Sequence, residues 1–256
     1  MSFEPFSQTE KGIYMNFEIR LTSISNFLED CEKAFDKYIL GELTQIGKAI
    51  DRGEYSNDYP KDYLLRGFNE AIYKEMVPYF VLSYVILVTS EFEKCIKKVC
   101  DKIKEKYKLL TNIEDFKKKK GMGLIDAARK YLSDHGKFES PEIAHWNAIK
   151  DIYQIRNIIV HNDLEYEKLR KYQKEAVNRI VKKNCGIKKE SDPFADFSSR
   201  DKNYKPLPTK IKIDWKFCEY TIKEVMTFFD NLKKEHFKRT FGSIAEVRTK
   251  AETKEK

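Results

Sequence analysis

The sequence predicts an all-α fold, a bundle of about six to seven helices, and three observations support this prediction. Of the 256 residues, 41% are hydrophobic and 13% are aromatic, which is enough for one well-filled core. Charged residues make up 35%, with only 10 glycines and 7 prolines, a balance that favours long solvent-exposed helices over a turn-rich β architecture. Apolar residues also recur every three or four positions along several segments. We therefore expect a single helical domain over residues 1–256.

The first 75 residues are predicted to form an N-terminal helical extension. Residues 1–22 have a mixed pattern that predicts no regular element. A long helix is predicted over residues 23–51, and the segment GEYSNDYP at 53–60 ends it. A second helix is expected to follow that segment, and Pro78 is expected to restart or kink the chain.

Periodicity and helix breakers predict the next elements. The strongest periodicity runs from Tyr79 to Lys108 and predicts a central core helix. The four lysines at 117–120 precede GMG and are expected in an exposed loop, before a helix over 124–132. Pro141 is well placed as the first residue of a helix over 141–160.

The C-terminal part combines helices with a long connection. Asn162 and Glu165 form a capping-box pattern, which predicts that a new helix starts at Asn162. Residues 185–212 form a basic connection whose short KIKI alternation predicts a small hairpin or strand. A final amphipathic helix is expected over 215–237, and residues 241–256 are expected to form a frayed tail.

Positive charge accumulates along the chain. The net charge is −5 over residues 1–80, +5 over 81–160 and +8 over 161–256. A polyanion such as RNA is the natural partner of a basic surface, because each neutralised phosphate releases counterions. The lysines expected to bind RNA are Lys182, Lys183, Lys188 and Lys189.

Cysteine usage and hydropathy bear on the compartment. The five cysteines include neither a CxxC pair nor a His/Cys spacing typical of metal sites, so we expect a reducing compartment, no metal ion and no cofactor. The longest apolar run, at 77–88, is shorter than the roughly 20 residues that span a bilayer. A signal peptide is not evident at the start of the sequence. We expect a cytoplasmic protein without a membrane partner.

The most informative stretch is RNIIVH, which starts at Arg156 near the end of the helix predicted over 141–160. Arg156 lies within about 40° of Ile152 on that helix, in the middle of an apolar stripe. A guanidinium there is costly unless a carboxylate, a phosphate or a partner surface receives it. Asn157 can orient a ligand oxygen beside it. His161 is about 140° further round, but the predicted helix junction frees it to turn back, and a helix C-terminus favours its imidazolium form.

Arg156, Asn157 and His161 match the motif of the HEPN superfamily of nucleotide-binding and ribonuclease domains. That motif is an Arg, often followed by a polar residue, and then a His after four to six residues. The segment VTSEFEKCIKKVCDKI resembles the central helix of the family, with Glu91 as an acidic residue that supports the site. The resemblance implies a HEPN-like core over residues 76–240.

The resemblance implies a metal-independent endoribonuclease, with the role of a toxin or phage-defence effector and an antitoxin or regulatory protein as a further partner. In the family the ribose 2′-OH attacks the adjacent phosphate and leaves a 2′,3′-cyclic phosphate and a 5′-OH. Arg156 and His161 are of the types that stabilise phosphate charge and transfer protons. The resemblance also implies a homodimer in which two RNxxxH segments face each other across a two-fold axis.

Two alternatives stay open. One is a non-catalytic RNA-binding or dimerising HEPN-like module. The other is an unrelated helical protein in which Arg156 pairs with a core carboxylate such as Glu91. A second Arg–His pair, Arg129 and His135, fits the loose spacing but lacks the polar amide after the arginine, so the site at Arg156 is preferred.

Overall fold

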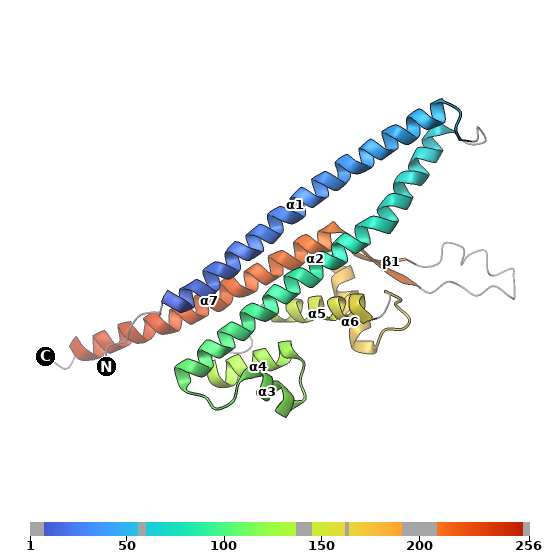
Figure 1. Ribbon diagram of the computed structural model, residues 1–256. Coiled ribbons are helices and arrows are strands. Elements are labelled where there is room, and N and C mark those ends of the chain that lie inside the picture. The colour runs from blue at the N-terminus through green and yellow to red at the C-terminus, as the bar shows by residue number, and fades with distance from the viewer. Residues whose placement is uncertain (1–7, 56–59, 137–144, 162–163, 191–208, 253–256) are drawn as a thin grey trace. The chain divides into compact units, whose positions relative to one another are not determined.

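The computed structural model describes residues 8–55, 60–136, 145–161, 164–190 and 209–252, and it confirms the predicted mostly helical fold (Figure 1). Within these residues the chain forms seven helices and one antiparallel hairpin. No helix among them is both long enough and apolar enough to cross a membrane. The elements are α1 (Gln8–Asp51), α2 (Lys61–Tyr107), α3 (Ile113–Lys120), α4 (Leu124–Gly136), α5 (Trp146–His161), α6 (Lys171–Lys182), β1 (Ile187–Glu190), β2 (Lys210–Ile213) and α7 (Trp215–Glu252).

The chain folds into two compact units, and each gathers segments that are far apart in the sequence. The first unit takes its described residues from Met1–Thr22, Val88–Lys150 and Ile222–Lys256. The second unit takes them from Ser23–Leu87 and Asp151–Thr221. The limits fall inside α1, α2, α5 and α7, so each of these helices contributes to both units.

An aromatic cluster forms the core of the first unit. The rings of Phe92, Phe228 and Phe229 lie with their centroids 5.3 Å apart in each pair. Phe17 packs on Phe229 at 4.2 Å, and Trp146 packs on Phe228 at 4.9 Å. Tilted and edge-on aromatic pairs stabilise a core beyond the area that they bury. The cluster therefore holds together the parts of α1, α2, α5 and α7 that belong to this unit.

Branched aliphatic residues dominate the core of the second unit. Ile152, Ile155 and Ile158 of α5 are at most 1% exposed, and their spacing of three places them along one side of the helix. Further fully buried residues of this core come from α2, α6 and α7, among them Val81, Val85, Ala176, Val177, Ile180 and Phe217. The last turn of α5 differs, because Val160 is 42% exposed and His161 is exposed.

Helix α1 begins earlier than the sequence predicts. Residues 8–22, for which the sequence predicts no regular element, form the first turns of α1. Tyr14 and Leu21 are 3% and 1% exposed, and they continue a seven-residue spacing that Leu28 and Phe35 extend. A seven-residue repeat of apolar positions is typical of long helices that pack along one seam. This apolar repeat therefore explains why the helix includes residues before the start that the sequence predicts at residue 23.

Helix α2 continues through Pro78, where the sequence predicts a restart or a kink. Proline removes one backbone hydrogen bond and crowds the preceding turn. Val77 and Val81, on either side of it, are 6% and 0% exposed. Burial of this part of α2 therefore outweighs the local cost of the proline.

The lysines at 117–120 lie in a helix, which corrects the prediction of a loop. They form the last turn of α3, and Gly121 closes that end with a φ of 61°. At the other end Asn112 Oδ1 accepts a hydrogen bond from the Asp115 backbone N–H at 2.8 Å. Lysines in a last turn interact favourably with the helix dipole, which explains why a charged run extends the helix here.

The helix predicted to start at Asn162 begins at Lys171 instead. Asn162 itself lies outside the described residues, as does Pro141. The N-terminus of α6 is capped by a hydrogen bond from the Arg170 backbone N–H to Gln173 Oε1 at 3.0 Å. Glu165, the other half of the predicted capping box, instead forms an isolated bridge with β2.

The hairpin predicted within 185–212 is confirmed, because β1 and β2 pair antiparallel. Residues 191–208 lie outside the described part. Gly186 precedes β1 with a φ of 79°, and a Cβ there would collide with the Phe217 backbone nitrogen. Only glycine suits that position.

Helix α7 extends to Glu252, beyond the predicted end near residue 237. The prediction of a frayed tail over 241–256 is therefore wrong for residues 241–252. Alanine, glutamate, lysine and arginine are frequent in that stretch, and no proline interrupts it. These residues have high helix propensity, which favours continuation of the helix.

Candidate functional site

Arg156 is a half-buried cation with few partners. Its Nη1 donates a hydrogen bond to Asn157 Oδ1 at 3.0 Å, and its Nε is buried without a hydrogen-bond partner among the described residues. No carboxylate of those residues forms an ion pair with it. A guanidinium has five N–H donors, and burying them unpaired is costly. The described part of the chain therefore gives no support to neutralisation of Arg156 by a core carboxylate.

His161 is the last residue of α5 and is exposed. The prediction that it turns back toward Arg156 is wrong, because the helix includes His161. The two side chains are about 140° apart around α5 and about 7.5 Å apart along its axis. Asn157 lies one turn before His161, about 40° away. The Arg156–Asn157 hydrogen bond therefore draws the guanidinium toward the His161 side.

A bidentate ion pair between α5 and α6 sets the rotation of α5. Asp151 Oδ1 and Oδ2 accept hydrogen bonds from Arg179 Nη2 and Nε at 2.6 and 2.9 Å. Asp151 is 4% exposed, and its hydrogen bonds raise the pKa of Arg179. The sequence analysis missed this pair. The one available signal was an acidic residue directly before Ile152, at the edge of the apolar stripe.

The residues that follow the RNxxxH segment pair with the hairpin. The Ile211 backbone N–H donates to the Leu164 carbonyl at 2.9 Å, and the Tyr166 N–H donates to the Thr209 carbonyl at 2.8 Å. These bonds lie on the edge of β2 away from β1, so the segment extends the two-stranded sheet on that side. The end of α5 and the hairpin are thereby fastened to each other within the second unit.

The predicted RNA-binding lysines all belong to the second unit and are exposed. Lys183 Nζ donates to the Tyr220 hydroxyl at 3.0 Å and lies 5.4 Å from the ring centroid. Lys189 Nζ donates to Asn178 Oδ1 at 3.0 Å and lies 4.6 Å from the Tyr166 ring centroid. The other two, Lys182 and Lys188, have no acidic partner among the described residues.

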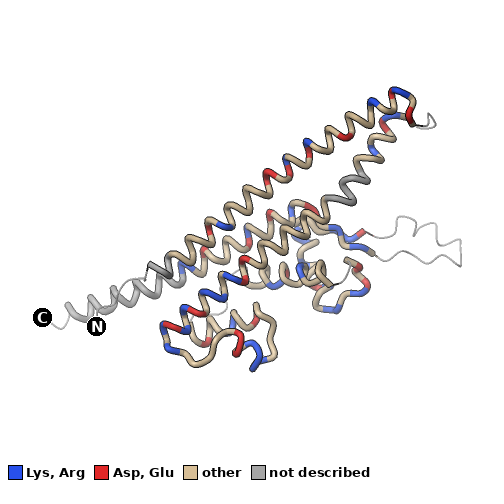
Figure 2. The backbone as a smooth tube through the Cα atoms, in the orientation of Figure 1, with Lys and Arg blue, Asp and Glu red and all other residues tan. Residues whose placement is uncertain are grey.

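Two further lysines complete a basic face that the sequence analysis missed. In the hairpin register Lys188 is opposite Lys212, and Glu190 is opposite Lys210. Opposite residues and residues two apart share a face of a sheet, so Lys188, Lys210 and Lys212 lie together, and we name them the lysine face. Glu190 forms an ion pair with Lys212. Figure 2 shows the basic residues on both strands. The KIKI alternation already carried the signal, because its isoleucines are buried and its lysines are not.

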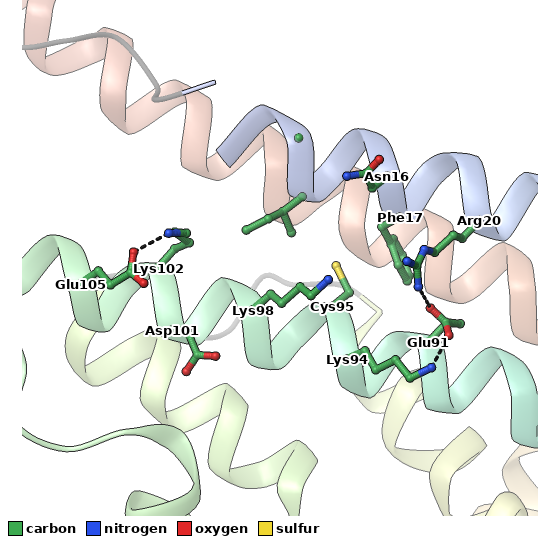
Figure 3. A pocket seen from close by; sticks show the side chains of 12 residues that line it. Asn16, Phe17, Arg20, Glu91, Lys94, Cys95, Lys98, Asp101, Lys102 and Glu105 are labelled. Atoms are coloured by element: carbon green, nitrogen blue, oxygen red, sulfur yellow. Dashed lines mark hydrogen bonds and ion pairs between the residues drawn. The ribbon is translucent and has the colours of Figure 1, made fainter. Parts of the chain in front are cut away.

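Glu91 belongs to the first unit, where two cations hold it. Its Oε1 accepts from Lys94 Nζ at 2.6 Å and its Oε2 accepts from Arg20 Nη1 at 3.0 Å (Figure 3). The hydrogen bond from Lys94, followed by that from Arg20, lowers the pKa of Glu91. The three residues line a groove of about 490 Å³ between α1 and α2. Support of Arg156 by Glu91 stays a prediction.

Other nucleophile and metal chemistries find little support in the described residues. Burial raises the pKa of Cys95 to about 12 and raises the pKa of Cys100 and Cys218 as well, so these cysteines remain thiols at neutral pH. His135, of the second Arg–His pair, packs its ring on Tyr131 at 4.8 Å and on Phe116 at 5.7 Å. No group of three or more His, Cys, Asp or Glu in the described part is placed to hold a metal ion.

Comparison with protein-family models finds no match, and searches of curated proteins and of solved structures find none at the significance threshold. The resemblance to the HEPN superfamily stays a prediction that rests on the RNxxxH segment of the sequence.

We predict that Arg179→Met lowers the free energy of unfolding by about 3 kcal/mol, because it leaves the Asp151 carboxylate buried without its cation. Urea denaturation followed by circular dichroism measures this loss. The double variant Asp151→Leu with Arg179→Met removes both charges and should recover most of the stability. Equal losses in the single and double variants would contradict the prediction.

We predict that Glu91→Gln lowers stability at pH 7 by about 1 kcal/mol, with the exposed cations Arg20 and Lys94 setting this modest size. The lowered pKa means that the ionised carboxylate stabilises the fold fully above the ordinary glutamate pKa of about 4.3 and loses this effect as the pH falls through the folded value. The difference between variant and wild type should therefore shrink below about pH 4.

The control for this prediction is Glu105→Gln, whose carboxylate is 64% exposed beside Lys102. Thermal unfolding between pH 3 and 7 compares the variants. A Glu91→Gln difference that stays constant with pH would contradict the assigned cause.

Proposed function

We propose that the chain is a metal-independent endoribonuclease whose site is built from Arg156, Asn157 and His161. Arg156 binds a non-bridging phosphate oxygen, Asn157 holds the guanidinium in place, and His161 transfers the proton. The ribose 2′-oxygen bonds to phosphorus while the bond from phosphorus to the 5′-oxygen breaks. One imidazole takes the 2′-hydroxyl proton and an imidazolium protonates the leaving 5′-oxygen, so the products are a 2′,3′-cyclic phosphate and a 5′-hydroxyl.

The observation that carries the proposal is the incomplete set of hydrogen bonds that the Arg156 guanidinium makes. The guanidinium is half-buried, donates a hydrogen bond to the Asn157 amide and has no carboxylate partner among the described residues. A phosphate oxygen is an acceptor that satisfies such a donor set, because guanidinium and phosphate match in charge and in bidentate geometry. A purely structural arginine would be expected to have an acidic partner.

A homodimer supplies the groups that one chain lacks. Because Arg156 and His161 are about 140° apart on α5, one chain does not direct both at the same atom from opposite sides. Two chains related by a two-fold axis present two arginines and two histidines, so His161 and His161 of the partner subunit serve as base and acid. The exposure of Val160, on the Arg156 side of the last turn, is consistent with such an interface.

The lysine face supplies the binding surface for the RNA backbone. Lys188 is opposite Lys212, and Glu190 offsets part of the charge through its ion pair with Lys212. Three lysines and one carboxylate on this face leave an excess of positive charge that attracts a polyanion. The segment after His161 is hydrogen-bonded to β2, so the proposal places the bound strand beside the end of α5.

A second candidate function is RNA binding without cleavage. The separation of Arg156 from His161 favours it, because a single chain then holds phosphate without a complete acid–base pair. Both functions share the lysine face and differ in the role of His161. An activity assay with a His161 variant distinguishes them.

We predict that the purified protein cleaves RNA in the presence of EDTA and that His161→Ala lowers the rate by about 10² to 10⁴, the range for loss of a general acid or base. Gel analysis of a labelled RNA measures the rate. New 3′ ends that stay blocked to ligation after phosphatase alone, and become ligatable after treatment with polynucleotide kinase, identify cyclic phosphates. RNA affinity should change little.

The matched control is His135→Ala, which removes the histidine of the second Arg–His pair. Loss of cleavage on chelation with rescue by magnesium would overturn the mechanism. Equal cleavage by wild type and His161→Ala would show that His161 is not the catalytic group, and absence of cleavage by the wild type would leave RNA binding as the function.

We predict that the double variant Lys188→Gln, Lys210→Gln weakens RNA binding mainly at low salt. In a His161→Ala background, the slope of log K against log salt should flatten by about 0.7 for each lost contact with a single strand. Fluorescence anisotropy with a labelled RNA measures the slope. The control is Lys118→Gln with Lys119→Gln on α3, and equal flattening in that control would place the binding surface elsewhere.

A further inference from the structure

The second unit holds an aromatic pocket that the proposed nuclease function does not use. Four of its lining residues are aromatic, and they come from α1, α2 and α7: Phe27, Phe80, Tyr84 and Trp215. Leu28, Cys31, Ser83 and Leu87 complete the lining, and the cavity measures about 110 Å³. No basic residue lines it. The cavity is of the size of one side chain rather than of a cofactor.

The aromatic wall is partly open to solvent. Phe27 is 60% exposed and Phe80 is 45% exposed. Phe80 and Trp215 have ring centroids 6.5 Å apart, and Phe35 packs against both of them from within, at 5.8 and 6.4 Å. Exposed aromatic rings held in place by a buried one present π-faces that attract cations.

A buried hydroxyl of the pocket has no partner. Tyr84 is 5% exposed, and its hydroxyl oxygen is buried without a hydrogen bond among the described residues. Burying a hydroxyl without a partner is costly, and native structures usually satisfy such groups. A ligand N–H that enters the pocket would supply the donor that this oxygen lacks.

Acidic residues lie near the pocket, because Glu219 is close enough to raise the pKa of Tyr84 and to interact with Glu32. Glu219 follows Trp215 by one turn of α7, and Glu32 follows Cys31 on α1. Burial, and then the carboxylates of Glu219, Asp36 and Glu29, raise the pKa of Glu32. Within residues 27–36 of α1 and 215–219 of α7, the basic residues are Lys33, which is paired with Glu29, and the exposed Lys216. The acids therefore include carboxylates that repel one another and that an incoming cation would stabilise.

From the aromatic lining, the unpartnered Tyr84 hydroxyl and the acidic surroundings, we propose that this pocket binds a basic side chain, lysine or arginine, of a partner polypeptide. The alkyl part packs on Phe27 and Leu87, and the cationic head lies against the rings of Phe80 and Trp215. Tyr84 accepts a hydrogen bond from the head, and Glu32 and Glu219 attract it from the rim. The proposal is independent of the nuclease function.

The test uses n-butylammonium and n-butylguanidinium as probes of the two side chains. In ¹⁵N-labelled full-length protein, the Trp146→Phe variant assigns the indole N–H resonance of Trp215. Titration at constant ionic strength should shift that resonance with a dissociation constant of about 10 mM, as befits a ligand of so few atoms. The Trp146 resonance, from the core of the first unit, should not move.

Two variants and one neutral probe separate charge from apolar packing. Glu219→Gln should weaken binding about fivefold, whereas Asp230→Asn, which removes one negative charge elsewhere on α7, should not. Phe80→Leu keeps an apolar residue but removes the ring, and should weaken binding about threefold. Shifts of equal size with 1-butanol, or no shift with either cation, would overturn the proposal.

Discussion

Burial of one side of α5 is the constraint on which the candidate site depends. Ile152, Ile155 and Ile158 are closed off in the core of the second unit, so the polar chemistry of the helix has to lie at its edge or in its last turn. The ion pair of Asp151 with Arg179 fixes the rotation of the helix about its axis. Substitution of these isoleucines by smaller residues should therefore shift the site residues of α5, although the isoleucines are not part of the candidate site.

The same constraint explains why the site is incomplete in one chain. A helix that continues through its final histidine separates positions five apart by about 140°. The buried Ile158 belongs to the same last turn. The proposed assembly across a two-fold axis would add a second copy of each group without any change of fold. In that proposal the acceptor for the half-buried Arg156 guanidinium is a phosphate oxygen of the substrate.

Elements with a local cause could be predicted from the sequence, and contacts between distant segments could not. The core helices follow from apolar periodicity, and the hairpin follows from the alternation at residues 210–213, because each pattern is complete within a few residues. The backbone of Glu165 pairs with that of Lys210, 45 positions away. The local capping pattern therefore did not predict the conformation of Glu165. The Asp151–Arg179 pair and the lysine face likewise join segments whose proximity exists only in the folded chain.

In the second unit the acidic N-terminal part and the basic C-terminal part of the sequence contribute to different surfaces. Glu32, from its acidic N-terminal part, and Glu219, from α7, lie near the aromatic pocket, and its basic C-terminal part contributes the lysine face. A polyanion is attracted to the lysine face and repelled by the acids, whereas a basic side chain has the opposite preference. Electrostatic complementarity discriminates between partners in this way more than it adds to affinity. Under the two proposals, the two surfaces select different classes of molecule, and an RNA and a basic polypeptide need not compete for one of them.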